Sequence, residues 1–374
     1  MRKLALRDEI LLSIEKPARY IGNEVNAVMK SRDVDIRFAM CFPDVYEIGM
    51  SHLGIQILYD MFNKREDTWC ERVYSPWTDL DAVMRKEHIP LFALESQDPI
   101  KDFDFLGITI QYEMCYTNIL QILDLSGIPM MAVDRTWDDP IVIGGGPCAY
   151  NPEPLADFFD LFYIGEGEVV YDELLELFKK AKKEGWSREE FLHQASHIAG
   201  IYVPSLYKVS YHEDGTITAF EPVYDDVPKT VEKQIVMDVT NASYPKTPVV
   251  PFIKCTQDRV VLEIQRGCIR GCRFCQAGMI YRPTRERDLE MLKEYAYAML
   301  KSTGHEEISL SSLSSSDYSD LAGIVNFLID EFEKTGVNIS LPSLRIDAFS
   351  LDVMSKVQDI KKSSLTFAPE AGSQ

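Results

Sequence analysis

The sequence contains no apolar run near the roughly 20 residues that a membrane-spanning helix needs. Its first stretch, MRKLALRDEILLSIEKP, is charged and helix-like and has no secretory-signal pattern. The chain also has no excess of positive charge, because 59 acidic residues against 39 basic residues give a formal net charge of -20. That charge opposes a large, non-specific surface for nucleic-acid phosphates. We therefore expect a cytoplasmic globular protein that does not contact a membrane.

The pattern of apolar residues predicts an α/β protein with two domains, since 374 residues exceed the ~250 at which single cores stop growing. Short apolar runs alternate with amphipathic stretches between DIRFAMCF and VVYDELLELFKKAKKEG, which is typical of a parallel sheet with helices on both faces. The same rhythm returns after Arg259 but stops after a fourth strand pattern, which predicts a partial β/α barrel truncated at its C-terminus. The expected parts are a helical lead-in (1–32), a doubly wound Rossmann-like domain (33–185), a connector with short antiparallel strands (186–255) and the partial barrel (256–374).

Three of the eight cysteines, Cys268, Cys272 and Cys275, form a Cys-x3-Cys-x2-Cys pattern within RGCIRGCRFCQAG. Random placement would rarely produce this triplet, and a reducing compartment favours metal or cluster binding over disulfides. Zinc needs four ligands or three plus water, and Cys255 is available as a fourth. An iron-sulfur cluster held by three thiolates would keep one iron open for a ligand. Three buried structural cysteines are the remaining alternative.

The position of the triplet in the chain also indicates an active site. The apolar run VVLEIQ ends just before the first cysteine, so the thiols follow the C-terminal end of a strand, where α/β folds place active sites. Three glycines would let the loop wrap tightly, and three arginines would help to keep the thiolates ionised. These residues are Gly267, Gly271 and Gly278, and Arg266, Arg270 and Arg273.

With the aromatic Phe274 directly before the third cysteine, this loop after the first strand of a β/α barrel resembles that of radical S-adenosylmethionine (SAM) enzymes. The resemblance implies that Cys268, Cys272 and Cys275 hold a [4Fe-4S] cluster whose open iron chelates SAM. One electron from the cluster then cleaves the sulfonium and yields a 5'-deoxyadenosyl radical, which abstracts a substrate hydrogen. The resemblance also implies an electron donor of the flavodoxin or ferredoxin type, and it places Phe274 near the adenine.

Later strands offer residues for the rest of the SAM site. The superfamily's usual Gly-Gly-Glu after the second strand is absent, and we expect Ser311 and Ser312 of EISLSSLSSS to hold the methionine amino group in its place. Arg345 and Asp347 share one face of LRID, where Arg345 would pair with a carboxylate. Glu370 in SSLTFAPEAG would accept hydrogen bonds from an ammonium or a ribose. The alternative for each of these residues is a solvated strand end.

The N-terminal domain resembles the B12-binding domain of some radical SAM proteins, most clearly in IGGGPCAYNPEPLADFFDLFYIGEGE, and PDVYEIGMSHLGIQILY resembles one branch of them. The resemblance covers nearly the whole chain and implies family members that continue beyond residue 374. It implies bound cobalamin, approached by the backbone at Gly144, Gly145 and Gly165, although tight strand-to-helix turns are the alternative. The Asp-x-His-x-x-Gly motif that supplies a histidine to cobalt is missing, with no histidine between His88 and His193. We therefore expect cobalamin without that lower ligand.

Two other patterns carry less weight. The glycines of GGGP fail the dinucleotide-binding spacing, because Ala149 stands at its final position. His193 and His197 are four residues apart but have no nearby carboxylate in register, which favours a surface helix over a metal site.

Two classes of function remain. The first is a radical SAM enzyme, with methyl or methylthio transfer to RNA, a peptide or a small metabolite as the reaction. The second is a non-catalytic iron-sulfur or zinc module that binds a partner. The polar residues on later strands favour the enzyme, because a binding module would not need them at the rim that carries the cysteines.

Overall fold

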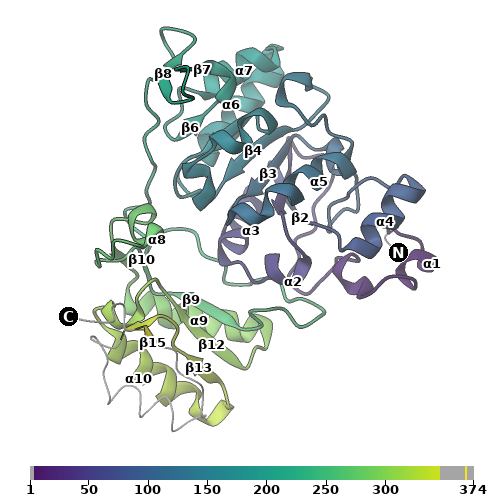
Figure 1. The fold of residues 1–374 in the computed structure, drawn as a ribbon. Helices are drawn as coiled ribbons and strands as arrows, with labels where there is room; N and C mark the ends of the chain where they lie inside the picture. Colours follow the sequence, from purple (N-terminus) through teal and green to yellow (C-terminus); the bar gives the residue numbers. More distant parts are fainter. Residues whose placement is uncertain (1–3, 346–366, 369–374) are drawn as a thin grey trace. The chain divides into compact units, whose positions relative to one another are not determined.

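The computed structural model describes residues 4–345 and 367–368, and the chain divides into two compact units (Figure 1). The N-terminal unit comprises Met1–Val236 and Pro251–Cys255, and the C-terminal unit comprises Met237–Val250 and Thr256–Gln374. Most of the range expected as a connector, 186–255, therefore belongs to the N-terminal unit. Within the described residues, every helix is too short or too polar to cross a membrane.

The N-terminal unit is built on a six-stranded sheet in the order β2-β1-β3-β4-β5-β6. Neighbouring strands are parallel except for β6, which pairs antiparallel with β5. The strands are β1 (Ile36–Phe42), β2 (Thr68–Tyr74), β3 (Phe105–Thr109), β4 (Ile141–Gly145), β5 (Leu161–Tyr163) and β6 (Ile201–Tyr202). The helices are α1 (Asp8–Leu11), α2 (Tyr46–Gly49), α3 (Leu53–Lys64), α4 (Thr78–Glu87), α5 (Tyr116–Ser126), α6 (Tyr171–Glu184) and α7 (Arg188–Ala195), and a hairpin of β7 (Tyr207–Tyr211) and β8 (Ile217–Pro222) follows. This strand order confirms the doubly wound fold.

Both faces of β1 are covered, which explains its nearly continuous apolar sequence. On one face, the ring of Phe38 stacks on Phe62 of α3 with ring centroids 4.4 Å apart, and Phe105 of β3 lies 5.5 Å away. Ala39 and Cys41 alternate with Phe38 and belong to a separate buried apolar cluster that includes residues of α4 and α5. Helices on both faces of a parallel sheet are what the alternating sequence pattern predicted.

The C-terminal unit contains a three-stranded parallel sheet in the order β13-β12-β9. Its strands and helices alternate along the chain as expected for part of a β/α barrel. They are β9 (Val260–Glu263), α9 (Leu289–Thr303), β12 (Glu307–Ser311), α10 (Leu321–Phe332) and β13 (Asn338–Ser340), and the short strands β14 (Leu344–Arg345) and β15 (Phe367–Ala368) pair in parallel. Between β9 and α9 lie the antiparallel pair β10 (Gln265–Arg266) and β11 (Arg285–Glu286), and the short helix α8 (Gln276–Ile280).

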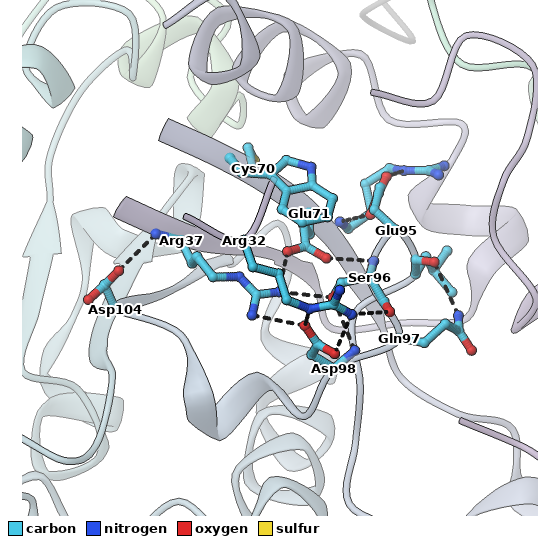
Figure 2. A network of polar contacts seen from close by, with 12 residues as sticks. Arg32, Arg37, Cys70, Glu71, Glu95, Ser96, Gln97, Asp98 and Asp104 are labelled. Atoms are coloured by element: carbon cyan, nitrogen blue, oxygen red, sulfur yellow. Dashed lines mark hydrogen bonds and ion pairs between the residues drawn. The ribbon is translucent and has the colours of Figure 1, made fainter. Parts of the chain in front are cut away.

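Strand β2 lies at the edge of the N-terminal sheet, yet all seven of its residues are buried. Carboxylates close this edge: Glu95 accepts from the Arg72 backbone N–H at 2.7 Å, and Glu71 accepts from the Ser96 N–H at 2.7 Å (Figure 2). Leu94 N–H also donates to the Arg72 carbonyl at 2.9 Å. These bonds satisfy backbone groups that an open edge would present to another chain.

The Arg72 side chain is the centre of the polar network at this edge. Its guanidinium bonds Glu24 at 2.8 Å and Glu95 at 2.6 Å, and all three side chains are almost fully buried. Burial opposes ionisation of Glu24, but the charge and hydrogen bonds of Arg72 hold the pKa of that carboxyl below its usual value. Glu24 is therefore charged beside Arg72, and removal of one partner from this network leaves an uncompensated buried charge.

We predict that Glu95→Ala lowers the free energy of unfolding of the N-terminal unit by about 3 kcal/mol, because Arg72 loses one carboxylate and its backbone N–H loses an acceptor. Glu87→Ala is the control, since it removes only exposed ion pairs, with Arg7 and Lys86, and should cost less than about 1 kcal/mol. Urea unfolding followed by tryptophan fluorescence measures both, since all four tryptophans lie in this unit. Equal losses in the two variants would contradict the role given to the buried network.

Candidate functional site

The segment RGCIRGCRFCQAG, residues 266–278, is called the cysteine loop. It follows β9 through β10 and turns at Gly267, whose φ of 79° lies in the left-handed region. A Cβ at this position would lie 2.5 Å from the Pro283 carbonyl oxygen and 2.6 Å from that of Tyr281. Backbone packing therefore requires glycine at position 267. Gly271 has open space around it, so its lack of a side chain is not needed for local packing.

Cys268, Cys272 and Cys275 form no disulfide, and all three are partly exposed. Two of them accept backbone hydrogen bonds, Cys268 Sγ from Arg270 N–H at 3.4 Å and Cys275 Sγ from Gly278 N–H at 3.3 Å at the start of α8. Such N–H donors stabilise thiolates and tune cluster potentials. Within residues 4–345 and 367–368, no three His, Cys, Asp or Glu side chains are grouped so that they could hold a metal ion.

Cys255, the alternative fourth ligand, belongs to the N-terminal unit and is buried. Its thiol lies 3.5 Å from the carbonyl oxygen of Ile253. The donor set on the loop itself thus consists of three thiols, which is the ligand chemistry of an iron-sulfur cluster with one open iron.

The arginines of the loop differ in their surroundings. Arg266 Nε donates to Glu263 Oε2 at 3.0 Å, and Arg270 Nε donates to Asp317 Oδ2 at 2.9 Å. Arg273 is exposed. Two of the three positive charges expected beside the thiols are therefore paired with carboxylates.

Glu263, the last residue of β9, joins several elements. Arg287 is fully buried and donates to the Glu263 carboxylate at 2.9 Å and to its carbonyl oxygen at 3.1 Å. The Arg287 guanidinium also lies over the ring of Tyr244, 4.7 Å from its centroid. Tyr244 donates to the Val261 carbonyl at 2.6 Å and accepts from the Glu263 N–H at 3.0 Å, and burial raises the pKa of this hydroxyl above its usual value. The starting point of the cysteine loop is thus fixed on several sides.

Sequence analysis did not single out Glu263 or Arg287. The available signal was a charged residue in the apolar run VVLEIQ and the third arginine in RPTRER. Glu263 is a polar residue at a position where the strand pattern predicts burial.

The serines expected at the SAM amino group lie at the end of β12. Ser311 is opposite Glu263 in the parallel register, and its carbonyl accepts from Ile264 N–H at 3.0 Å. The Ser312 hydroxyl lies 3.0 Å from that of Ser315. The structure therefore brings Ser311 to the same end of the sheet as the start of the cysteine loop.

The other expected SAM contacts divide into two groups. Phe274 is 74% exposed on the cysteine loop, with its ring accessible for stacking. Arg345 is the last residue of β14, while Asp347 and Glu370 lie outside the described residues, as does the side chain of Arg345.

Glycines at the C-terminal edge of the N-terminal sheet have different roles. A Cβ at Gly144 would lie 2.5 Å from the ring of Phe162, and one at Gly165, where φ is 142°, would lie 2.4 Å from the carbonyl oxygen of Gln234. Internal packing therefore accounts for both. Gly145 has nothing within 4 Å of its Cβ position, so it is the expected cobalamin contact with free space beside it.

His52 also lies at this edge, in the segment after β1, before the interval that lacks histidine. Its Nδ1 caps α3 by accepting from Ile55 N–H at 3.3 Å. Burial lowers the pKa of His52 to about 4, although a hydrogen bond with Gln111 acts in the opposite direction. The ring is neutral near pH 7 and is held by the protein's own groups.

His193 and His197 face a carboxylate that the sequence pattern did not reveal. Their Nε2 atoms lie 3.3 Å and 3.5 Å from the two oxygens of Asp226. Asp226 is remote in sequence from α7, which is why helical spacing could not identify it.

Comparison with known proteins identifies the class. Residues 54–204 match the family of N-terminal regions of radical SAM proteins, and residues 262–374 match the radical SAM superfamily. These matches identify the C-terminal region as a radical SAM domain, as the cysteine loop predicted, and the region before it as the N-terminal part of a radical SAM protein.

Individual relatives are longer than this chain. The uncharacterized protein MJ0966 of Methanocaldococcus jannaschii is 30% identical over 339 residues, which are 90% of this chain and 61% of that protein. The cobalamin-dependent SAM radical enzyme OxsB, solved with aqua-cobalamin and SAM, matches with 14% identity and a TM-score of 0.52 over 88% of this chain and 42% of OxsB. The radical SAM methyltransferase TsrM from Kitasatospora setae, solved with cobalamin and a [4Fe-4S] cluster, matches with 13% identity and a TM-score of 0.53 over 87% of this chain and 58% of TsrM. At these identities the two structures share the fold with this chain.

We predict that Gly267→Ala lowers the stability of the C-terminal unit by at least about 2 kcal/mol, since a Cβ would collide with two backbone carbonyls in a left-handed turn. Gly271→Ala, four residues along the same loop, meets no neighbouring atom and should change stability by less than about 0.5 kcal/mol. Calorimetry of the two variants tests the difference. Similar unfolding temperatures for both would show that the turn at Gly267 tolerates a side chain.

Proposed function

We propose that this chain binds a [4Fe-4S] cluster through Cys268, Cys272 and Cys275 and cleaves SAM reductively. The observation that carries the proposal is the position of three thiols, without a fourth, on a loop that starts at the C-terminal end of β9. Two of the sulfurs already accept backbone N–H bonds, which supports thiolate ligands. The reduced cluster would supply one electron to the sulfonium of SAM, giving methionine and a 5'-deoxyadenosyl radical.

The chain's own residues would bind and orient SAM. Ser311 and Ser312 would receive the methionine ammonium through their oxygen atoms, in place of the Gly-Gly-Glu found elsewhere in the superfamily. The exposed ring of Phe274 would stack on the adenine. Arg345, Asp347 and Glu370 complete the proposed set as polar contacts to the carboxylate and ribose.

We further propose that the N-terminal unit binds cobalamin at the edge near Gly145, where there is space beside the backbone. Methyl or methylthio transfer to RNA, a peptide or a small metabolite is the reaction class that this combination supports. The proposal includes an electron donor of the flavodoxin or ferredoxin type and a cytoplasmic location, because reducing conditions keep cluster thiols reduced.

We predict that anaerobic reconstitution gives about four irons and four sulfides per chain, and that Cys272→Ala loses both the cluster and SAM cleavage. Two thiolates on the loop are too few to hold a cubane with one free corner. Cys255→Ala is the matched control and should keep both properties, since Cys255 lies in the other unit. Iron and sulfide analysis and 5'-deoxyadenosine formed under dithionite are the measurements, and neither requires the substrate. Stoichiometric zinc without sulfide, or cluster loss in Cys255→Ala alone, would contradict the proposed ligand set.

For the N-terminal unit, we predict that hydroxocobalamin binds the full chain in a form without a histidine on cobalt. His52→Gln should bind with the same spectrum and an affinity within a factor of about three, because its ring nitrogens are engaged by Ile55 and Gln111. Absorbance titration tests both chains. No spectral change at high micromolar cobalamin would remove this cofactor from the proposal, and a spectral change lost in His52→Gln would identify His52 as a cobalt ligand.

A further inference from the structure

The segment that follows β12, SLSSSDY, is anchored at several points along its length. The Ser315 hydroxyl donates to the Pro342 carbonyl at 2.7 Å, and Gln265 Nε2 donates to the Ser314 carbonyl at 3.1 Å. Tyr318 donates to the Arg287 carbonyl at 2.8 Å, and burial raises the pKa of its hydroxyl to about 12, so it remains a donor. Ser314 and Ser315 are buried. We call this segment, residues 312–318, the serine loop; it is a fixed base beside the cysteine loop.

Arg270 connects the cysteine loop to this base. It lies midway between Cys268 and Cys272, and its backbone N–H donates to Cys268 Sγ at 3.4 Å. Its Nε donates to Asp317 Oδ2 at 2.9 Å, and its Nη2 donates to the other oxygen of the same carboxylate. The side chain of one residue thus reaches the serine loop while its main chain touches a thiol.

Asp317 is itself held in place. Its side chain is only 8% exposed, and Ser314 Oγ donates to Oδ2 at 2.8 Å. A planar guanidinium bound through two parallel bonds to an oriented carboxylate differs from an ordinary surface ion pair, because little side-chain freedom is left to lose. Lysine cannot reproduce this two-bond contact.

The charge of Arg270 is matched by Asp317, so the pair adds little net charge beside the thiols. What the pair does supply is a link between two loops that are 47 residues apart in the sequence. The first carries the thiols, and the second directly follows Ser311 and begins with Ser312.

We propose that Arg270 and Asp317 form a positioning pair that holds the cysteine loop in register with the serine loop, and so sets the distance between the cluster ligands and the residues that orient the methionine end of SAM. This inference rests on the proposed function and assigns roles to two residues that do not themselves touch SAM. Arg270 acts through the thiols on either side of it, and Asp317 acts through Arg270.

The test compares Arg270→Gln, Asp317→Asn and the double variant with the parent chain, using Arg273→Gln as the matched control. Arg273 is on the same loop and is exposed, so its change removes the same charge without breaking the pair. We expect each pair variant to raise KM for SAM roughly tenfold, and the double variant to be no worse than either single one, because one contact is lost in all three. The control should keep the parent KM.

Two further measurements separate position from charge. Hydrogen exchange of residues 266–278, measured on the metal-free chain, should accelerate in both single variants and in Arg270→Lys, which keeps the charge but loses the two-bond geometry. The midpoint potential of the cluster should not move in opposite directions in Arg270→Gln and Asp317→Asn.

Potential shifts of opposite sign with an unchanged KM would show that the two residues act only through their charges, and would overturn the positioning role. Increases in KM that add in the double variant would also overturn the positioning role. Hydrogen-exchange rates in the single variants equal to those of the parent chain would do the same. Absence of cluster and SAM cleavage in the parent chain would instead refute the proposed function. In that case the exchange rates of the metal-free chain still decide whether the pair holds the loop.

Discussion

The buried contact between Arg287 and Glu263 determines where the candidate site begins. Arg287 binds both the carboxylate and the carbonyl of Glu263, and the same arginine lies over Tyr244, which bonds the β9 backbone. The end of β9 therefore has one position, and Cys268, the first cysteine of the loop, lies two residues after β10. A loop that must present three thiols to one cluster needs such a fixed origin, because a shift of about 1 Å at its base would move every ligand.

Buried arginines perform the same task in the two units. Arg72 joins Glu24 and Glu95 and closes the edge of the N-terminal sheet, while Arg287 joins Glu263 to the backbone of Val239. Arginine suits both places because it stays charged when buried and carries several donors in a rigid plane. In each case a carboxylate partner compensates the charge. Arg287 also donates to the backbone carbonyls of Glu263 and Val239, and Arg72 also donates to Met50 Sδ. Polar residues in these cores therefore fix geometry at points where apolar packing alone would permit sliding.

The roles of the loop arginines and of individual glycines could not be predicted from residue type alone. Three arginines beside three thiols suggest a positive field, but Arg266 and Arg270 each have a carboxylate partner, so their main effect is on loop position. Glycines behave similarly. Gly267 is required by two carbonyls facing it, Gly271 faces open space, and Gly165 makes room for the backbone at Gln234. Each distinction depends on atoms supplied by a distant part of the chain.

The sequence by itself determined the class of protein, because its signals are local. The spacing of Cys268, Cys272 and Cys275 and the alternation of apolar strands with amphipathic helices are readable within short windows, and they predicted the radical SAM superfamily and the α/β fold. Tertiary structure alone decided which groups meet: Arg270 with Asp317, Arg287 with Glu263, and His193 with Asp226. These partners are 47, 24 and 33 residues apart, and no sequence periodicity relates them. Their contacts exist because strand order and loop packing return remote segments to the same place.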